Sequence, residues 1–183
     1  MPRGGVPLAL VVAEELNAPL DLVFVRKIGH PLHPEYAIGA LTEEEAPILH
    51  PDESRSIDQS WLENQISELR LENRKRRKKY LSGQPQIPLT DRTVILVDDG
   101  IATGFTLLSA IDAIRKHAPK AIVVAVPISP KETAVKIQSK VDQLIAIEIP
   151  EYFAGAIGAY YQDFSQVSDK EVIQMLKKFK KAF

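Results

Sequence analysis

Two adjacent carboxylates and the loop behind them form the group of residues in this chain best suited to chemistry. Asp98 and Asp99 directly follow the apolar run 93–97. The loop residues after them are Gly100, Ala102, Thr103, Gly104, Phe105 and Thr106. Glycines let backbone N–H groups turn toward one point, and the positive end of a following helix favours an anion there. Two carboxylates beside such an anion cup fit a ligand with a phosphate at one end and vicinal hydroxyls at the other, as in a ribose 5-phosphate.

The spacing of this segment excludes two common nucleotide loops. A Walker A loop needs Gly-Lys-Ser/Thr, and a dinucleotide loop needs Gly-x-Gly-x-x-Gly, and neither pattern occurs here. A simple strand-to-helix turn, with the acids as helix caps, would explain one acid. It would not explain two adjacent acids together with two glycines and two threonines.

The elements that must position this loop alternate between strands and helices. The predicted order is a strand at 93–97, a helix at 105–117, a strand at 121–126, a helix opening at the capping box 129–132 and a strand at 144–147. Buried strands that alternate with helices imply an α/β fold with a parallel sheet flanked by helices. Ligands of such sheets bind beyond the carboxyl ends of the strands, where Asp98 lies.

The rest of the chain gives less regular predictions. They are a helix at 6–16, a buried strand at 21–25, a short hairpin of 36–41 and 46–50 around the acidic run 43–45, one long helix from Glu53 to Lys79, and a C-terminal helix from the capping box 168–171 to about residue 181.

Composition narrows the class of protein. The 183 residues fit a single domain, 1–183. The chain has no Cys, which excludes disulfides, thiolate metal sites and a cysteine nucleophile. With 23 basic and 24 acidic residues, the net charge of −1 provides no general attraction to nucleic acid or membranes. The longest apolar runs, 6–13 and 121–128, fall short of the ~20 residues that span a bilayer. We therefore expect a cytoplasmic protein with neither a membrane nor a nucleic-acid partner.

The segment Val94-Ile-Leu-Val-Asp-Asp-Gly-Ile-Ala-Thr-Gly-Phe-Thr106 closely resembles the 5-phosphoribosyl-1-pyrophosphate (PRPP) motif of type I phosphoribosyltransferases. The shared pattern is long and ordered: four apolar residues, two acids, a glycine and a Thr-Gly-x-Thr loop. The resemblance implies that Asp98 and Asp99 are the catalytic acids that bind the ribose hydroxyls, and that residues 102–106 bind the 5-phosphate. It also implies a Mg²⁺ cofactor that Asp98 and Asp99 help to hold indirectly, through water or PRPP.

Two further segments are similar to this family. Pro2-Arg3-Gly4-Gly5 looks like its pyrophosphate loop, and glycine N–H groups at a helix start beside an arginine suit that role. Arg26-Lys27, directly after the strand predicted at 21–25, resembles a basic pair near pyrophosphate. The whole chain looks like a group of uncharacterised bacterial proteins with a phosphoribosyltransferase domain. The segments that carry this wider likeness are 26–29, 34–40 and 163–169.

The resemblance implies a division of the chain and an activity. A Rossmann-like core would comprise 1–27 and 90–150, a lid or hood with a long helix 28–89, and a C-terminal segment and helix 151–183. The activity would be Mg²⁺-dependent transfer of ribosyl 5-phosphate from PRPP to a nitrogenous base or related nucleophile, with release of pyrophosphate. By analogy with the family, we expect a homodimer. No side chain stands out as a general acid or base.

Two other functions stay open at this point. A non-catalytic PRPP-sensing or RNA-binding regulator on the same fold would use the basic run 74–79, which is otherwise a solvated helix end. The second is a nucleotide-binding module of another kind, but the chain lacks the Walker A and dinucleotide-binding motifs. The aromatic residues could stack on an acceptor ring or pack in the core; they are Tyr152, Phe153, Tyr160, Tyr161 and Phe164.

The start of the chain conflicts with the resemblance. The family's pyrophosphate loop follows a central strand, yet Pro2 comes directly after Met1. The resemblance therefore implies that a strand and a helix, roughly 20 residues, are missing. The hypothesis is that Met1 is an internal methionine taken as the start, or that the gene is truncated. Without that strand, we expect reduced stability and activity.

Overall fold

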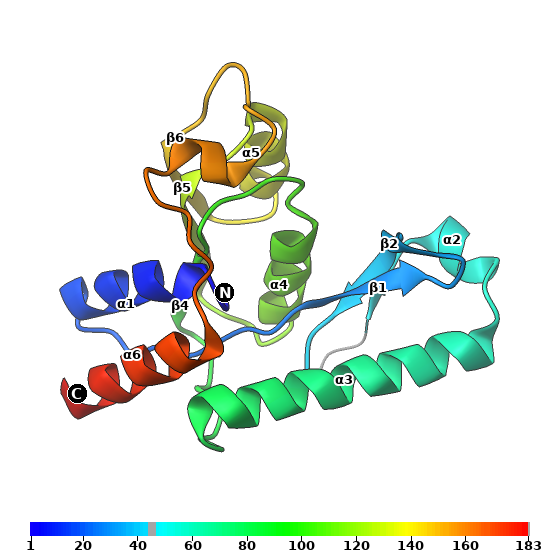
Figure 1. The fold of residues 1–183 in the computed structure, drawn as a ribbon, viewed down its shortest axis with the longest axis horizontal. Coiled ribbons are helices and arrows are strands. Elements are labelled where there is room, and N and C mark those ends of the chain that lie inside the picture. The colour runs from blue at the N-terminus through cyan, green and yellow to red at the C-terminus, as the bar shows by residue number, and fades with distance from the viewer. Residues whose placement is uncertain (44–46, 183) are drawn as a thin grey trace.

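The computed structural model describes residues 1–43 and 47–182 and contains a parallel and an antiparallel sheet. The parallel sheet has the order β4-β5-β6, with β4 at Thr93–Val97, β5 at Ala121–Ile128 and β6 at Gln143–Glu148. The antiparallel sheet has the order β1-β2-β3, with β1 at Arg26–His30, β2 at His33–Leu41 and β3 at Ile48–Leu49. The two sheets lie in different parts of the molecule (Figure 1).

The parallel sheet confirms the predicted α/β class. β5 lies in its middle, and alternate residues from Ile122 to Ile128 are buried while those between them are half-buried, so one face of the strand is fully covered and the other partly. The crossover helices are α4 (Phe105–Arg115) and α5 (Lys131–Gln138). α4 places Leu107 and Ile111 in the same apolar cluster as Leu96 of β4. This cluster fixes the strand end at which the paired carboxylates lie.

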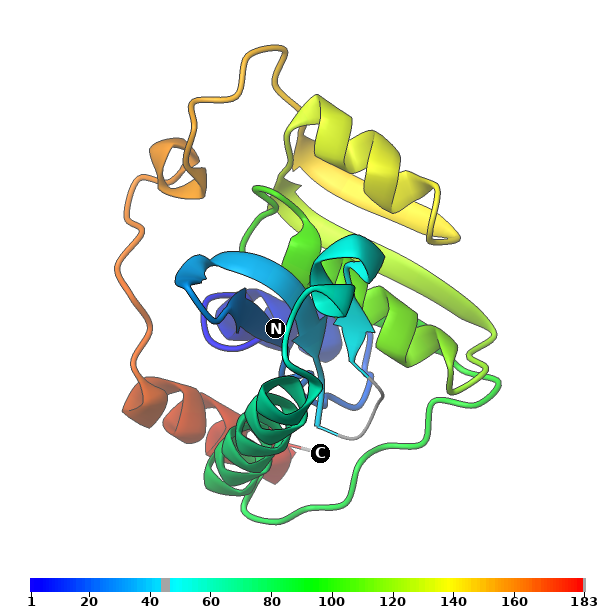
Figure 2. The ribbon, with the colours of Figure 1, turned by 90° about the vertical axis from the view of Figure 1, so that its right-hand side faces the viewer.

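A second apolar cluster lies between three helices on the other side of β4. α1 (Gly5–Glu15) and α6 (Asp169–Ala182) lie side by side, and the C-terminal end of α3 (Gln59–Leu81) packs against α6 (Figure 1). Val6, Tyr80 and Val172 contribute one buried side chain from each helix. The segment between β6 and α6 runs along one flank of the molecule and contains a short 3₁₀ helix, η1 (Ile157–Tyr160) (orange in Figure 2).

The prediction of a buried strand at 21–25 is wrong. The segment has the burial of a strand: Leu22 and Phe24 belong to the cluster between the helices, and Val23 and Val25 pack against the cluster below β4. It forms no strand because none of the strands in the described part of the chain lies beside it to complete the hydrogen bonds. Arg26 and Lys27 therefore do not follow a strand; they begin β1.

The prediction of one long helix from Glu53 to Lys79 is also wrong. The chain forms α2 (Pro51–Arg55) and α3 (Gln59–Leu81), with a break between them. Asp58 causes the restart, because its Oδ1 accepts a hydrogen bond from the Trp61 backbone N–H at 2.8 Å. The described residues of the segment 28–89 thus form antiparallel strands beside a long helix, and its role as a lid or hood stays a prediction.

The turn and cap predictions had mixed outcomes. β2 pairs with β3 as the predicted hairpin does, although residues 44–46 lie outside the described part of the chain and β1 was missed. The capping box at Ser168 is formed: its N–H donates to Glu171 Oε2 at 2.7 Å. The box at Ser129 is not formed, since Ser129 Oγ donates to the Pro130 carbonyl and Pro130 is the N-cap of α5.

None of the helices among the described residues combines the length and the apolar character needed to cross a lipid bilayer.

Candidate active site

The two carboxylates and their loop lie between the carboxyl end of β4 and the start of α4. Gly104, the residue before α4, has φ 74°, and a Cβ there would lie 2.6 Å from Thr133 Cγ2, so both conformation and space require glycine. Ala102, Thr103 and Thr106 are exposed around the N-terminus of α4. Their backbone and hydroxyl donors, with the positive end of the helix, form a cup for an anion.

The Pro2–Gly5 loop packs directly on the two carboxylates. A Cβ on Gly4 would lie 1.7 Å from Asp99 Oδ2, and one on Gly5 would lie 2.7 Å from Asp98 Oδ1. Two segments more than 90 residues apart in the chain therefore meet here, and glycine is what allows them to approach. α1 starts at Gly5, so the positive end of its dipole lies beside the two carboxylates, while the N–H groups of Gly5 and Val6 donate to the Met1 and Arg3 carbonyl oxygens.

Burial perturbs the acids of this site. The Asp98 side chain is 19% exposed, and burial raises its pKa to about 6; the Met1 ammonium, 3.8 Å from Asp98 Oδ1, opposes the rise and Asp99 adds to it. Burial also raises the pKa of Asp99. Such carboxylates are unfavourable as buried anions until a cation or hydroxyl donors reach them.

Asp98 and Asp99 could bind Mg²⁺ only together with other ligands. Carboxylate oxygens are the hard ligands that Mg²⁺ prefers, and it keeps several waters and phosphate oxygens around it. Among the described residues, no group of three or more His, Cys, Asp or Glu side chains forms a complete metal site. Asp98 and Asp99 could therefore hold Mg²⁺ together with water and a phosphate-bearing ligand.

Two residues that sequence reasoning did not assign to the site hold its loops in place. The Tyr161 hydroxyl donates to the Asp99 carbonyl oxygen at 2.6 Å, and Thr133 Oγ1 donates to the Ala102 carbonyl oxygen at 2.9 Å. Burial, Asp99 and Asp98 raise the pKa of Tyr161, so its hydroxyl stays a donor. Both contacts join residues more than 30 positions apart, and no local pattern signals them.

The basic residues predicted near pyrophosphate are separated. Arg3 is in the loop on the carboxylates, with Nη2 3.4 Å from Gln166 Oε1 and Nη1 3.5 Å from Asp169 Oδ1. Arg26 is held by α3, its Nη2 2.7 Å from Glu72 Oε2. The structure thus brings residues 2–5 and 98–106 together, whereas Arg26 and Lys27 begin the hairpin; their pyrophosphate contacts stay a prediction.

The family model for the phosphoribosyl transferase domain matches residues 1–163. This chain belongs to that family. Two proteins of Mycobacterium tuberculosis, MT0597 of strain CDC 1551 and Rv0571c of strain H37Rv, are provisionally named phosphoribosyl transferases. Each is 37% identical over 185 residues, an alignment that covers 100% of this chain and 42% of the relative. The chain thus spans less than half the length of these curated relatives.

A solved structure shares the fold. The crystal structure of TT1426 from Thermus thermophilus matches with a TM-score of 0.82 and 39% sequence identity, over 97% of this chain and 85% of that chain. The likeness therefore extends through the phosphoribosyl transferase domain and beyond it into α6, since the family match ends at residue 163.

The aromatic residues of this phosphoribosyl transferase domain lie along the segment after β6. Phe153 stacks on Tyr160 with ring centroids 5.5 Å apart, and Tyr161 packs against Phe164 at 4.9 Å. Tyr152 is 85% exposed, which excludes core packing for that ring. The basic run on α3 is partly used within the fold, because Arg77 pairs with Asp21 and Lys79 with Asp169.

Proposed function

We propose that this phosphoribosyl transferase domain transfers the ribosyl 5-phosphate group of PRPP to a nitrogen nucleophile and releases pyrophosphate. One observation carries the proposal: the Pro2–Gly5 loop lies on the same two carboxylates that lead into the anion cup, with Gly4 against Asp99. Two anion-binding loops at either side of a carboxylate pair suit a ligand with phosphates at both ends and hydroxyls between them. PRPP has that arrangement.

The residues would divide the ligand among them. Asp98 and Asp99 would accept hydrogen bonds from the ribose hydroxyls, and residues 102–106 at the start of α4 would bind the 5-phosphate. Arg3 and the N–H group of Gly4 would bind pyrophosphate, and Gly5, whose N–H donates to the Met1 carbonyl oxygen at 3.1 Å, would let the loop approach Asp98. Mg²⁺, when bound, would supply charge neutralisation at the pyrophosphate and ribose oxygens.

The reaction is a substitution at carbon 1 of the ribose. The bond from carbon 1 to the pyrophosphate oxygen breaks, and its electron pair leaves with pyrophosphate. A bond forms between carbon 1 and the acceptor nitrogen, which then loses its proton to solvent. Positive charge develops on the ribose ring as pyrophosphate leaves. Fixed carboxylates and a held leaving group would therefore lower the barrier by position and charge.

The test is release of pyrophosphate. The full-length protein is incubated with PRPP, Mg²⁺ and a panel of nucleobases, and we expect release with at least one acceptor. Asp99→Asn should slow it by about a hundredfold or more, because a neutral amide loses the charged contact. Asp52→Asn, on α2 with a side chain 98% exposed, is the matched control and should leave the rate unchanged. Equal rates for the two variants would exclude the assignment of Asp99.

A regulator on the same fold predicts a different outcome of that assay. It would bind PRPP saturably and release no pyrophosphate with any acceptor. An RNA-binding regulator would use the basic run of α3, in which Arg77 is held by Asp21 and Lys79 by Asp169 while Arg74, Lys75 and Lys78 are exposed, and nothing in that run accounts for the carboxylate pair and its two loops. We therefore propose the transferase as the function.

A further inference from the structure

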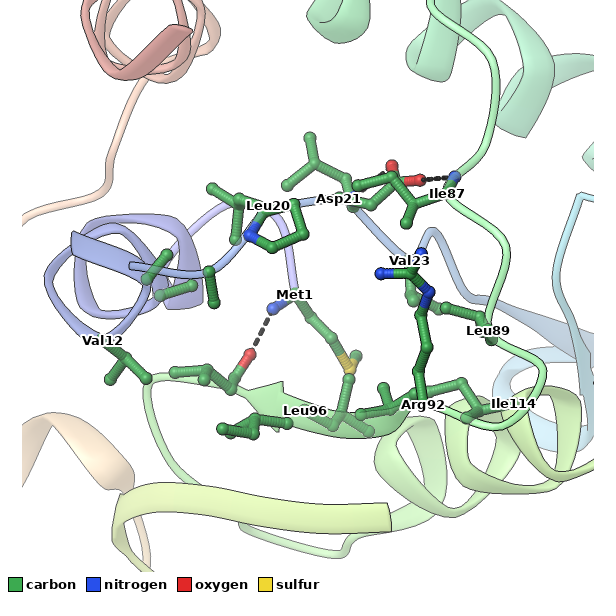
Figure 3. A pocket seen from close by; sticks show the side chains of 18 of the residues that line it. Met1, Val12, Leu20, Asp21, Val23, Ile87, Leu89, Arg92, Leu96 and Ile114 are labelled. Atoms are coloured by element: carbon green, nitrogen blue, oxygen red, sulfur yellow. Dashed lines mark hydrogen bonds between the residues drawn. The ribbon is translucent and has the colours of Figure 1, made fainter. Parts of the chain in front are cut away.

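The turn between β4 and α4, residues 98–104, is held by elements that lie far away in the sequence. At its β4 end, the Asp98 N–H donates to the Ala125 carbonyl oxygen at 3.4 Å. The Met1 amino group donates to the carbonyl oxygen of Val97, one residue earlier (Figure 3). These two bonds fix where the turn begins, but they do not determine the direction of the carbonyl groups within it.

The direction of these carbonyl groups matters because the turn leads into the anion cup. An anion is bound by backbone N–H groups that converge on it, and a carbonyl oxygen that points to the same place repels it. Within the described part of the chain, the N–H groups of Ala102, Thr103 and Gly104 donate to no hydrogen bond. They are therefore available to an anion as long as the neighbouring carbonyl groups point elsewhere.

Thr133 of α5 sets the direction of the carbonyl group at the start of the cup. Its Oγ1 donates to the Ala102 carbonyl oxygen at 2.9 Å, and Thr133 is only 7% exposed. The carbonyl of a trans peptide and the N–H of the next residue point in opposite directions. A bond that holds the Ala102 carbonyl toward α5 therefore directs the Thr103 N–H away from α5. Thr133 Cγ2 also lies against Gly104, where a Cβ would come within 2.6 Å.

Tyr161 sets the direction of the carbonyl group beside the carboxylates. Its hydroxyl donates to the Asp99 carbonyl oxygen at 2.6 Å. The next residue is Gly100, where a Cβ would lie 2.7 Å from Cγ2 of Ile157 in η1. Glycine allows this close approach, but it does not restrict the backbone that follows Asp99. The bond from Tyr161 supplies that restriction and so fixes the orientation from which the Asp99 side chain projects.

We propose that Tyr161 and Thr133 are positioning residues for the two ends of a sugar phosphate, Tyr161 for the ribose end and Thr133 for the phosphate end. The proposal rests on the proposed function, in which Asp99 binds the ribose hydroxyls and residues 102–106 bind the 5-phosphate. Tyr161 acts through Asp99, and Thr133 acts through the N–H groups of the cup. Each hydroxyl donates its proton to a backbone carbonyl, so neither is a donor to the ligand.

The two positioning residues can be changed separately, because they belong to different elements. Thr133 lies on α5, and Tyr161 directly follows η1. Thr133→Val removes Oγ1 and keeps a methyl group against Gly104. Tyr161→Phe removes the hydroxyl and keeps the ring that packs against Phe164 with centroids 4.9 Å apart. Each variant therefore removes one hydrogen bond and retains the packing around it.

The experiment titrates the protein with inorganic phosphate and with ribose 5-phosphate and follows the NMR signals of the Thr103 and Gly104 amides. These signals report binding at the cup itself. Thr133→Val should weaken both probes by the same factor, about tenfold, because both use the N–H groups of the cup. Tyr161→Phe should weaken ribose 5-phosphate by about tenfold and leave inorganic phosphate unchanged, because only the sugar reaches Asp99.

Matched variants test whether each hydroxyl is responsible. Thr133→Ser keeps a hydroxyl and should bind inorganic phosphate as the unmodified chain does. Tyr160→Phe makes the same change one residue before Tyr161, at a hydroxyl that bonds to the backbone of residues 152–154. It should leave the affinity for both probes unchanged.

A double variant tests whether Tyr161 acts through Asp99. Asp99→Asn alone should weaken ribose 5-phosphate and leave inorganic phosphate unchanged. Adding Tyr161→Phe to Asp99→Asn should weaken ribose 5-phosphate no further, because residues that act through one another are not additive.

Three results would overturn the proposal. The first is a Tyr161→Phe variant that changes the affinity for both probes equally, or for neither, as a merely structural role would. The second is a Thr133→Val variant that binds inorganic phosphate normally. The third is a double variant in which the losses from Tyr161→Phe and Asp99→Asn multiply.

The readout separates this proposal from the transferase activity. A chain that shows the expected pattern of affinities but releases no pyrophosphate with any acceptor would refute the transferase and support the two positioning roles. If the Thr103 and Gly104 signals responded to neither probe, the ligand assignment would be wrong and the positioning roles would be overturned with it.

Discussion

Two five-residue segments, 93–97 and 21–25, each have one polar residue followed by four apolar ones, yet they differ in structure. The first forms β4 and pairs with β5 along its whole length. The second alternates its side chains between two clusters as a strand does, but α3 side chains take its carbonyls. The difference shows that an apolar run determines burial, while a strand also needs a neighbour with free backbone groups.

The largest expected difference between the two runs is in local stability. In the 183-residue chain, we expect the amides of Leu96 and Val124 to exchange only by global unfolding, at an opening free energy of about 5 kcal/mol or more. Those of Val23 and Val25 should open at about 2 kcal/mol or less, because no ladder holds them. Hydrogen exchange by NMR measures both. Equal protection of the two pairs would mean that side-chain contacts alone fix a strand-like segment.

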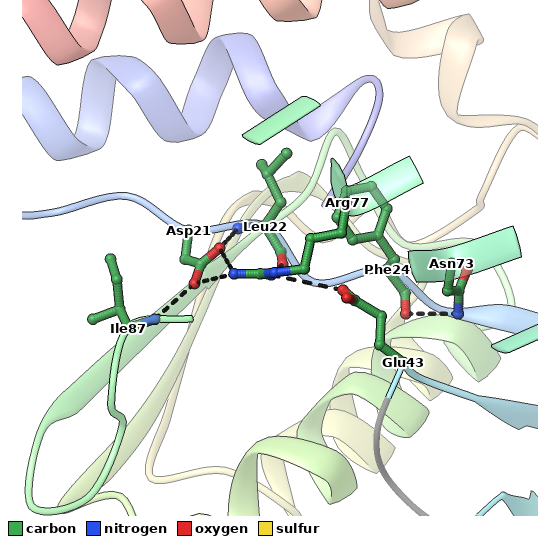
Figure 4. Close-up of polar contacts among 7 residues, drawn as sticks. All are labelled: Asp21, Leu22, Phe24, Glu43, Asn73, Arg77 and Ile87. Carbon is green, nitrogen blue, oxygen red and sulfur yellow. Dashed lines mark hydrogen bonds and ion pairs between the residues drawn. The ribbon is translucent and has the colours of Figure 1, made fainter. Parts of the chain in front are cut away.

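The next prediction concerns the contacts by which Arg77 of α3 holds the segment 21–25 in place. Arg77 and Asp21 are 14% and 18% exposed, and Arg77 also lies 3.6 Å from Glu43 (Figure 4). Arg77→Ala leaves two acids and the Leu22 carbonyl without this partner, so we expect a loss of about 3–5 kcal/mol and a fall in Tm of roughly 10 °C. Thermal unfolding followed by circular dichroism checks it.

The matched control for Arg77 lies in the parallel sheet region. Arg115→Ala breaks an ion pair with Asp142 whose partners are 46% and 48% exposed. Water screens that pair, so Tm should change far less. If Arg77→Ala and Arg115→Ala lowered Tm equally, the contacts of Arg77 with the segment 21–25 would stabilise the protein no more than an exposed ion pair does.

A smaller effect is expected at the second contact by which α3 holds the segment 21–25. Asn73 is fully buried, its Nδ2 holds the Phe24 carbonyl, and its Oδ1 has no hydrogen-bond partner. Asn73→Ala should reduce the free energy of unfolding by about 1–3 kcal/mol, because Phe24 O is left unsatisfied. Ser109→Ala, at a buried hydroxyl that bonds within α4, should have a smaller effect in urea titration. If Asn73→Ala were more stable than the unmodified chain, the cost of burying the unpaired Oδ1 would exceed the stabilisation from the hydrogen bond to the Phe24 carbonyl.

The smallest effect concerns the helices that cover residues 21–25. Lys79 and Tyr80 of α3 donate to Asp169 of α6 and lower its pKa to about 2 from 3.8. Between these values the unfolded chain binds more protons, so stability rises with pH; the contribution is complete above about pH 4 and disappears as pH falls through 2. Asp169 is 35% exposed, so the gain should stay below about 1 kcal/mol.

The acid range provides the measurement for this contact. Asp169→Asn should flatten the rise of Tm between pH 2 and pH 4, and Tyr80→Phe, which removes one donor, should flatten it in part. A Tm profile in Asp169→Asn that matched the unmodified chain would rule out the contact between α6 and α3 as a source of acid stability.

Local signals explain which predictions succeeded. Residues 93–106 carry their own strand, turn glycine and helix start, and the structure has them as predicted. Ser168 and Glu171 form a capping box because the box needs no distant partner. One local signal was missed, the helix N-cap residue Asp58. It lies in a stretch whose apolar residues repeat at helical spacing, and that spacing alone does not show where one helix ends and the next begins.

Long-range geometry explains which predictions failed. Whether residues 21–25 form a strand depends on a neighbour that the run itself does not specify. Nothing in the sequence near Arg26 shows that Glu72 will hold it, and Tyr161 reaches Asp99 only because the segment after β6 returns across the site. The meeting of residues 2–5 with the carboxylates followed from the family resemblance rather than from local pattern.

The C-terminal segment bears on where this domain should be said to end. The family match stops at residue 163, but Gln166 and Asp169 hold Arg3, and α6 supplies Val172 and Leu176 to the cluster that covers α1. A fragment cut at the family boundary would expose that apolar surface and release one of the two loops at the carboxylates. The unit that can be exchanged, fused or crystallised is therefore longer than the unit that sequence similarity delimits.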